Sequence, residues 1–215
     1  MSDDPEFPGL SSPPCLMHEL SADFRMAERR TAPWAEVAPW RKDERKRLID
    51  ERFDLTVDER QASATRIAAG LDAVIPPPAG RIFGIYWPFR GEPDLRDWAI
   101  RVMGAGGRIA LPVVIEKKQP LEFRLWAPGD PLERGVWDIL VPAQGAVVHP
   151  HVVVAPVVGF DEEKYRLGYG GGFYDRTLAV LPGDPLKIGV GYVKSRLPTI
   201  YPQPHDIPMD LIVTD

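Results

Sequence analysis

The segment HVVVAPVV, residues 151–158, is apolar at every position after its first residue. A strand that is exposed on one face alternates apolar and polar residues, whereas a central strand of a parallel sheet is apolar throughout because helices cover both of its faces. The segment therefore predicts a central strand of a parallel sheet that is buried on both sides.

Segments on either side of this strand alternate between strand-like and helix-like patterns. Short apolar or alternating runs predict strands at residues 81–88, 108–114, 121–126, 186–192 and 211–214. Apolar residues at helical spacing predict helices over about residues 41–53, 57–75, 93–103 and 173–180. Strands and helices in this order predict an α/β fold, a three-layer α/β/α sandwich with a mostly parallel open sheet.

The composition is that of an ordinary globular protein. The 215 residues suffice for one domain, and the net charge of −5 argues against a protein that binds nucleic acid through a basic surface. The single cysteine, Cys15, excludes an internal disulfide framework and fits a reducing compartment. No secretory signal is recognised, and the longest uncharged stretch, residues 139–160, contains prolines and histidines unlike a membrane span. We therefore expect a cytoplasmic protein that acts without nucleic acid or a membrane.

Residues 1–40 differ in composition from the rest, and we expect them to be an N-terminal extension of a single α/β domain at residues 41–215. They are rich in proline, serine and acidic residues and lack a sustained apolar period, which is typical of a loosely ordered arm. The alternative is an arm that packs Trp34 and Trp40 onto the domain, because exposed tryptophans in a free tail are unfavourable.

The segment RLGYGGGFYDR, residues 166–176, which we call the glycine loop, indicates the chemistry most strongly. Between a predicted strand and a predicted helix it contains Gly168, Gly170, Gly171 and Gly172. Glycine lets the backbone approach a ligand closely, and the first turn of a helix offers unpaired N–H groups that bind phosphate. Arg166 and Arg176 suit phosphate oxygens, and Asp175 is a carboxylate of the kind that binds Mg²⁺ beside a nucleotide. The segment therefore predicts an anion-binding loop.

Two common phosphate-binding motifs do not fit this loop. A P-loop requires lysine and then serine or threonine after its last glycine, and neither follows here. The dinucleotide-binding motif G-x-G-x-x-G/A is broken by Phe173 at its last position, which disfavours a nicotinamide-dependent dehydrogenase.

The glycine loop, with GFDEEKY (residues 159–165) before it and PHDIPMDLIVTD (residues 204–215) after it, resembles the 5-formyltetrahydrofolate cyclo-ligase family. Members, also called 5,10-methenyltetrahydrofolate synthetases, use ATP and Mg²⁺ to close 5-formyltetrahydrofolate into 5,10-methenyltetrahydrofolate, releasing ADP and phosphate. The likeness covers about residues 41–215 and includes a basic helix, a helix start L-T-x-x-E-R and a G-E turn after the first strand. It implies an ATP-dependent ligase that acts on a reduced folate.

The resemblance implies which residues bind the nucleotide and its metal ion. The phosphate-binding positions of the family correspond to Arg166, Gly168, Gly170, Gly171 and Gly172. Asp175 corresponds to the Mg²⁺ ligand and Asp206 to a second carboxylate at the metal, so Arg166 and Asp175 are the implied catalytic residues. In the basic helix, which reaches the nucleotide in the family, Arg45 takes the position of an arginine. Arg41 takes that of a lysine, and Lys42 lies one residue away.

The resemblance also implies a folate site. Phe173 and Tyr174 correspond to aromatic residues that stack on the pterin, and Glu92 to a carboxylate that hydrogen-bonds it. Trp137 and Phe123 correspond to further aromatic positions at the substrate.

Several of these assignments have a purely structural alternative. Glu92 also suits the first turn of a helix, where a carboxylate is favoured by the helix dipole. Asp206 also suits a turn before a proline. Phe123 and Trp137 also suit the core, and Tyr169 also suits packing beside the loop.

Histidine and cysteine do not predict a metal site. Cys15 and His18 form a C-x-x-H pair, but no second pair of suitable spacing accompanies it. His149, His151 and His205 do not form a ligand set by their spacing, and we expect them to be structural.

The main alternative to the enzyme is a non-catalytic folate- or nucleotide-binding paralogue with a regulatory role. The missing lysine and the N-terminal extension motivate it, whereas the complete set of loop residues argues for catalysis. In either case we expect a monomer or a weak homodimer.

Overall fold

Seven strands form the central sheet of the structure, a computed structural model that describes residues 33–215. In sequence order they are β1 (Ile82–Gly84), β2 (Arg108–Val113), β3 (Glu122–Trp126), β6 (Val147–Val148), β7 (Val152–Pro156), β10 (Leu186–Gly191) and β11 (Leu211–Thr214). Two small separate pairs are β4 (Leu132–Arg134) with β5 (Leu140–Pro142), and β8 (Gly159–Phe160) with β9 (Arg166–Leu167).

The order across the sheet is β11-β10-β7-β1-β2-β3-β6. Neighbours from β11 to β2 pair in parallel, whereas β3 pairs antiparallel with both β2 and β6. Because β7 lies between β10 and β1, the apolar run at residues 151–158 does contain a central strand. The prediction of a mostly parallel sheet is confirmed.

Within the described residues the α-helices are α2 (Trp34–Phe53), α3 (Val57–Val74), α4 (Arg96–Gly104) and α5 (Phe173–Val180). Two 3₁₀ turns, η1 (Val136–Asp138) and η2 (Val193–Ser195), lie in the loops. Helix α3 begins at a capping box: the Thr56 hydroxyl accepts from the Glu59 amide at 3.2 Å, and the Glu59 carboxylate accepts from the Thr56 amide at 2.8 Å. These bonds satisfy amides that the first helical turn would leave unpaired.

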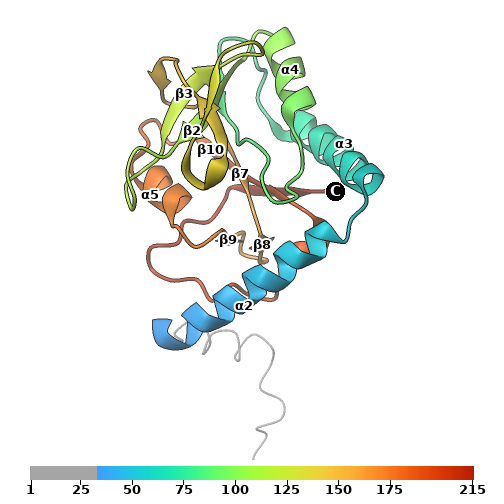
Figure 1. The fold of residues 1–215 in the computed structure, drawn as a ribbon, viewed down its shortest axis with the longest axis vertical. Helices are drawn as coiled ribbons and strands as arrows, with labels where there is room; N and C mark the ends of the chain where they lie inside the picture. Colours follow the sequence, from blue (N-terminus) through green and yellow to red (C-terminus); the bar gives the residue numbers. More distant parts are fainter. Residues whose placement is uncertain (1–32) are drawn as a thin grey trace, which may run out of the picture.

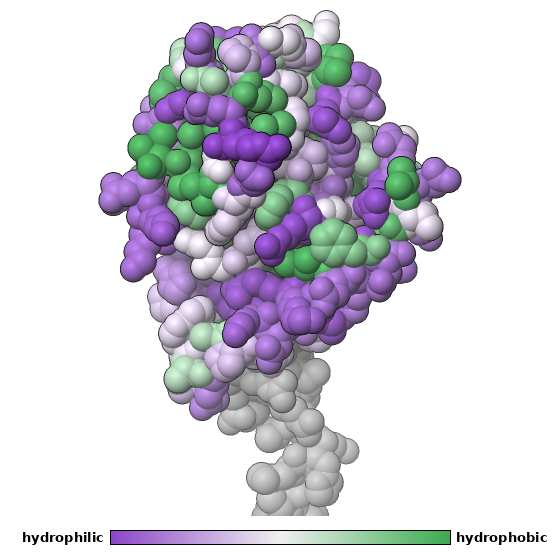
Figure 2. All heavy atoms as spheres, in the orientation of Figure 1, coloured by the Kyte–Doolittle hydropathy of each residue, from purple (hydrophilic) through white to green (hydrophobic). Residues whose placement is uncertain are grey.

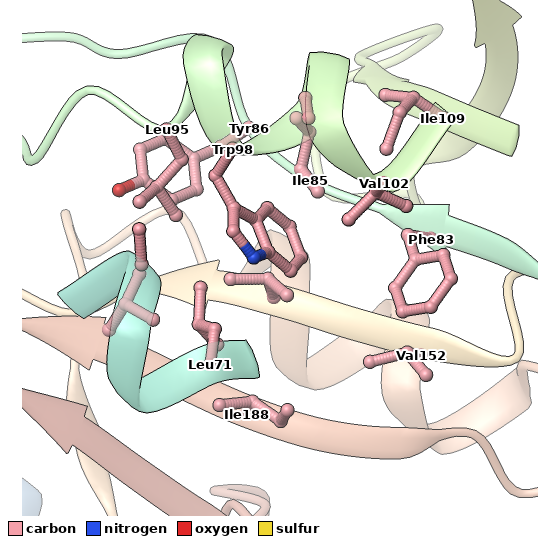
Figure 3. Packing of buried hydrophobic residues seen from close by; sticks show 14 of the residues in the cluster. Leu71, Phe83, Ile85, Tyr86, Leu95, Trp98, Val102, Ile109, Val152 and Ile188 are labelled. Carbon is pink, nitrogen blue, oxygen red and sulfur yellow. The ribbon is translucent and has the colours of Figure 1, made fainter. Parts of the chain in front are cut away.

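Successive residues of the central strands pack on opposite faces of the sheet. In β7, Val152 and Val154 point into the larger core beneath α3 and α4, which contains the fully buried Trp98 (Figure 3). Val153 between them belongs to the opposite face, where Leu178 of α5 packs. This alternation follows from the two-residue period of a strand and gives helices on both faces, so the expected three-layer sandwich is confirmed.

Helix α2 packs at one end of the sheet rather than over either face (Figure 1). Leu48 packs in a small separate core with Val158, which follows β7, and Leu167 of β9. The opposite side of α2 is highly charged, and Figure 2 shows hydrophilic surface over this part of the molecule. The buried side of α2 therefore faces the carboxyl ends of the parallel strands.

Three boundaries differ by three residues or more from those that the sequence predicts. Helix α2 begins at Trp34 and includes Pro39. Because proline has no N–H group, the carbonyl of Ala35 lacks its hydrogen-bond partner in the helix, and this is tolerated because Ala35 is exposed. Strand β1 ends at Gly84 because the chain then leaves the sheet, and α4 begins at Arg96, three residues later than predicted.

The predicted N-terminal extension overlaps the described residues only at its end, residues 33–40. Cys15 and His18 lie outside the described residues, as does most of the expected extension at residues 1–40. Trp40 packs edge-on against Tyr201 with ring centroids 4.7 Å apart, so this end of the segment does pack on the domain. No helix between residues 33 and 215 is both long and apolar enough to cross a membrane.

Candidate active site

A cleft with a volume of about 590 Å³ opens at the carboxyl ends of the central strands. Tyr86, which follows β1, Pro112 near the end of β2 and Pro156 at the end of β7 lie in its wall. The rest of the wall comes from α2, the glycine loop, the start of α5 and the segments around Trp137 and Asp206. Open α/β sheets bind ligands at this edge, because the loops that follow neighbouring strands converge there.

The glycine loop shapes one wall of this cleft between β9 and α5. Gly170 and Gly172 have left-handed backbone angles, with φ of 89° and 63°. A Cβ atom on Gly170 would lie 3.3 Å from the guanidinium carbon of Arg45, so glycine also leaves room for that side chain. Gly172 is the N-cap of α5 and offers no side chain to the first turn. The first amides of α5 therefore remain available to a bound anion.

Hydrogen bonds hold Arg166 and Arg45 beside the loop. Arg166 is 6% exposed and donates to Oδ1 of Asp175 at 2.8 Å. Arg45, on α2, donates through Nε to the carbonyl oxygen of Gly168 at 2.7 Å. Burial lowers the pKa of the Arg45 guanidinium. Both cations are thus oriented before any ligand binds.

Arg41 and Asp206 form a buried ion pair. Nη2 of Arg41 lies 2.5 Å from Oδ2 of Asp206, and the two side chains are 5% and 8% exposed. Arg41 also donates to the carbonyl oxygens of Ile200 and Tyr201, at 2.9 and 3.0 Å. Asp206 also accepts from the Gln203 amide at 2.7 Å. The pair joins α2 to the C-terminal segment. We call Arg41, Arg45, Arg166, Asp175 and Asp206 the arginine cluster.

Aromatic rings line the other part of the cleft. Trp137 lies edge-on to Phe173 with centroids 6.1 Å apart and is 6.5 Å from Tyr169, which in turn lies 5.9 Å from Phe89. Trp137 is 49% exposed and has a φ of 59°, a left-handed value that is unfavourable for a residue with a large side chain. Such strained residues concentrate at ligand sites. We call Phe89, Glu92, Trp137, Tyr169 and Phe173 the aromatic cluster.

Glu92 is the carboxylate of the aromatic cluster and is 6% exposed. Its Oε2 accepts from the Phe89 amide at 2.9 Å, and among the described residues it has no ion-pair partner. Burial raises the pKa of Glu92 to about 7, although Arg52, the Phe89 amide and the Tyr169 hydroxyl all act to lower it. Glu92 therefore changes its charge near neutral pH.

Arg52 is a buried cation behind this carboxylate, and the sequence did not single it out. It is 2% exposed and donates to the Tyr169 hydroxyl at 3.1 Å and to the carbonyl oxygen of Val157 at 2.5 Å. Its guanidinium also lies over the ring of Tyr192, 6.0 Å from the centroid. Arg52 thus connects α2 to the glycine loop and to the end of β7.

Tyr174 is a residue of the cleft wall, and its hydroxyl is a buried polar atom that has no hydrogen-bond partner among residues 33–215. Burial raises its pKa well above the usual value, so the hydroxyl stays protonated and can donate. A buried donor without a protein partner is suited to a polar ligand atom.

The sequence model of the 5-formyltetrahydrofolate cyclo-ligase family matches residues 37–215. The chain belongs to this family. The family that the glycine loop indicates is therefore confirmed, as is the expectation of a cyclo-ligase-type enzyme. The 5-formyltetrahydrofolate cyclo-ligase of Mycoplasma pneumoniae is 26% identical over 176 residues, which are 80% of this chain and 96% of the relative. That of Escherichia coli K12 is 29% identical over 137 residues, 61% of this chain and 75% of the relative.

Solved structures of similar proteins agree with the fold. The 5,10-methenyltetrahydrofolate synthetase of Aquifex aeolicus is 28% identical, with a TM-score of 0.69, covering 80% of this chain and 88% of that one. The 5,10-methenyltetrahydrofolate synthetase of Mycoplasma pneumoniae has a TM-score of 0.67 at 24% identity, covering 81% and 98%. The α/β sandwich is thus the fold of cyclo-ligase relatives.

Most of the predicted site residues of this cyclo-ligase family member line the one cleft. They are Arg41, Arg45, Glu92, Trp137, Arg166, Gly168, Gly170, Gly171, Gly172, Phe173, Tyr174, Asp175 and Asp206. Two predicted residues are not in this lining. Lys42 is exposed on the outer side of α2. Phe123 is 2% exposed and packs with Val153 in the core, so its structural alternative describes its position.

The cleft also contains residues that sequence reasoning did not assign to the site, namely Trp34, Tyr86, Trp87, Phe89 and Tyr169. For Arg52, behind the cleft, a signal was present: Arg41, Arg45, Leu48 and Arg52 recur at i, i+4, i+7 and i+11, on one side of a helix. Because three of these four residues are charged, the sequence did not indicate that this side of the helix is buried.

The two predicted metal carboxylates are in different situations. Both oxygens of Asp206 accept hydrogen bonds from protein donors. In Asp175, Oδ1 accepts from Arg166 at 2.8 Å and from the Ile207 amide at 3.1 Å, which leaves Oδ2 without such a bond in the described part of the chain. Between residues 33 and 215 no group of three or more His, Cys, Asp or Glu side chains is arranged to hold a metal ion.

Proposed function

We propose that this chain cyclises 5-formyltetrahydrofolate to 5,10-methenyltetrahydrofolate with ATP and Mg²⁺, releasing ADP and phosphate. The observation that carries the proposal is a single cleft in which the glycine loop and four arginines adjoin aromatic rings and a buried carboxylate. Family membership supports the cyclo-ligase activity, and the cleft supports the roles given below.

The arginine cluster and the glycine loop are assigned to the triphosphate. Arg166 and Arg45 are already oriented, and the first amides of α5 lack a capping side chain. Phosphoryl transfer depends on in-line positioning and on neutralising charge on the transferred group, more than on covalent help from the protein. Fixed guanidinium and N–H donors supply that neutralisation without reorganising during the reaction.

The aromatic cluster is assigned to the pterin. Trp137 and Phe173 offer flat apolar surface, Glu92 accepts hydrogen bonds from ring N–H groups when it is ionised, and the Tyr174 hydroxyl donates one. Rings that enclose the substrate also exclude water, so that the activated formyl group cyclises rather than hydrolyses.

The reaction needs activation because a formamide oxygen is a poor leaving group. Transfer of the γ-phosphoryl group to this oxygen breaks the bond to ADP and forms a phosphate ester on the formyl carbon. The neighbouring folate amine then attacks that carbon and loses its proton, and the C–O bond breaks to release phosphate. No side-chain nucleophile is required, and the chain's residues bind, orient and neutralise.

The described residues fit a Mg²⁺ ion that arrives with the nucleotide. Mg²⁺ usually takes one or two carboxylates and otherwise binds phosphate oxygens and water, so a three-residue protein cage is not needed. Oδ2 of Asp175, which is 21% exposed in the cleft wall, is the carboxylate oxygen placed to meet it. When bound, the ion neutralises charge on the β- and γ-phosphates. Asp206 is more suited to fixing Arg41.

The test is the absorbance of the methenyl-folate product when 5-formyltetrahydrofolate, ATP and Mg²⁺ are each omitted in turn. An increase that requires all three components is the expected result. A flat trace despite nucleotide binding would instead support the non-catalytic paralogue, which family membership does not favour. Light scattering of the same sample tests the expected monomer or weak homodimer.

A further inference from the structure

Trp34 lies in the wall of the cleft but outside the part of the chain that the family model matches. It is the first residue of α2, three positions before that match begins at residue 37. Its side chain is 50% exposed. An indole that faces solvent inside a ligand cleft is a large apolar surface which a flat ligand can cover.

The position of Trp34 is fixed by the arginine cluster. The guanidinium of Arg41 lies over the indole, 5.7 Å from the ring centroid, and the His205 ring meets it edge-on at 6.2 Å. Arg41 is itself held by the ion pair to Asp206. A cation over one region of an indole orients the ring. Trp34 is therefore placed beside the residues assigned to phosphate, away from the contacts that join the aromatic cluster.

We propose that Trp34 stacks on the base of the bound nucleotide. The inference rests on the proposed use of ATP, because the phosphates occupy the arginine cluster and the base is then the flat part of the nucleotide left to place. The rings around Glu92 are assigned to the pterin, whereas the ring contacts of Trp34 among the described residues are with His205 and Arg41. Stacking of a base on an aromatic side chain changes affinity by about 5- to 150-fold on alanine substitution. It tolerates different bases, because each has a π-face.

The experiment compares nucleotide and base-free binding in full-length Trp34→Ala, Trp34→Phe and Phe53→Ala. Phe53→Ala is the matched control, since Phe53 is an aromatic residue of the same helix, is 58% exposed and does not line the cleft. Calorimetry measures the Kd of ATP and of inorganic tripolyphosphate with Mg²⁺ present, without relying on turnover. We expect Trp34→Ala to weaken ATP at least fivefold and to leave tripolyphosphate within twofold. Trp34→Phe should stay within about threefold of wild type for both, and Phe53→Ala should change neither.

The other outcomes each contradict the inference in a different way. Unchanged ATP affinity in Trp34→Ala would mean that the indole does not meet the base. Equal weakening of ATP and tripolyphosphate would mean that Trp34 acts through Arg41 on the phosphate site. A raised KM for the folate alone would assign the indole to the other substrate. Absence of ATP binding to the wild-type chain would overturn the proposed function itself, and the stacking with it.

Discussion

The arginine cluster and the aromatic cluster share one cleft but differ in whether their buried charged groups form ion pairs. Arg166 lies 2.8 Å from Asp175, and Arg41 lies 2.5 Å from Asp206, so two of the three cations are paired with a carboxylate, and the third, Arg45, donates to the carbonyl oxygen of Gly168. Glu92 is as deeply buried as Arg41 and Arg166, yet among the described residues it has hydrogen bonds and no ion pair. The first arrangement fixes its charges, whereas the second leaves a carboxylate that titrates.

This difference predicts opposite responses to the loss of a charge. Removing one member of a buried ion pair leaves the other charge uncompensated, which typically costs about 3–5 kcal/mol of stability. Neutralising a carboxylate that is buried without a pair instead removes a desolvation penalty. The arginine cluster is thus organised in advance for an anion. A buried carboxylate that lowers the stability of the fold, such as Glu92, is expected at a site where ligand binding requires its charge.

The largest effect on activity is expected from Arg166→Ala. Loss of one oriented donor to the transferred phosphoryl group should lower turnover about 10²–10³-fold. Steady-state kinetics at saturating ATP and folate measures this, with Arg196→Ala as control, because Arg196 pairs with Glu162 on the surface and does not line the cleft. A folded Arg166→Ala protein with turnover within threefold of wild type would remove Arg166 from the phosphate site.

Glu92→Gln should have the next largest effect. It removes the charge from a hydrogen-bond acceptor, and a hydrogen bond to a charged group is typically worth about 1.5–3 kcal/mol, so KM for the folate should rise about 10- to 150-fold at pH 8. In the wild-type chain the same KM should rise as the pH falls below about 7, where Glu92 takes up a proton. The variant should show no such dependence, and a wild-type KM that is constant from pH 6 to pH 8 would contradict the role.

The stability of the same variant gives an independent measurement. The folded pKa of Glu92, about 7, lies above its ordinary value of 4.5, so between these pH values the folded chain binds the proton more strongly than the unfolded chain does. The contribution of Glu92 to the free energy of unfolding therefore decreases as the pH rises through this window, and stays constant above it. Urea unfolding at pH 5 and pH 8 should show this loss in the wild type, and Glu92→Gln should lack it.

The residues of the two clusters could not be predicted equally well from the sequence. The glycines and charged residues of the glycine loop are adjacent in the sequence, so it could be predicted that they lie together in the cleft. The apolar strand β7 could be predicted for the same reason. The burial of Arg52 depends on the carbonyl of Val157, which is 105 positions away, and in a charged helix nothing local distinguishes it from an exposed arginine. The burial of Phe123 could not be predicted from the sequence for a similar reason. Alternation showed that its strand has two faces, but the pairing of β3 with β2 and β6 decides which face is core.

Within the arginine cluster, Asp175→Asn and Asp206→Asn should differ in their dependence on Mg²⁺. Asp175 has a carboxylate oxygen left for the ion, so its loss should raise the Mg²⁺ concentration for half-maximal activity about tenfold, as is typical when one metal-site contact is lost. Asp206→Asn should leave that concentration within about twofold, whereas both variants should lower the free energy of unfolding, because each leaves a buried arginine without its partner. A large Mg²⁺ effect in Asp206→Asn would restore its predicted role as a metal ligand.

The smallest effect is expected from Arg52→Met, which tests how the aromatic cluster adjusts Glu92. The groups that face this carboxylate are Arg52 and the tyrosines Tyr86, Tyr169, Tyr174 and Tyr192, and of these Arg52 carries the positive charge. Without that charge the pKa of Glu92 should rise by about one unit, since an opposite charge nearby lowers a carboxyl pKa by about that much or more. At pH 7 the ionised fraction of Glu92 then falls about fivefold, and KM for the folate should rise by about the same factor.

The diagnostic readout for Arg52→Met is the midpoint of the pH profile of KM, since a general loss of stability would not move it. Arg52→Lys keeps the charge and is the matched control, so its midpoint should stay near that of the wild type. Tyr169→Phe removes one hydrogen bond to the carboxylate and should move the midpoint in the same direction as Arg52→Met, but less far. If Arg52→Met keeps the wild-type midpoint, the arginine only supports the fold, and Glu92 is adjusted by burial and its hydrogen bonds alone.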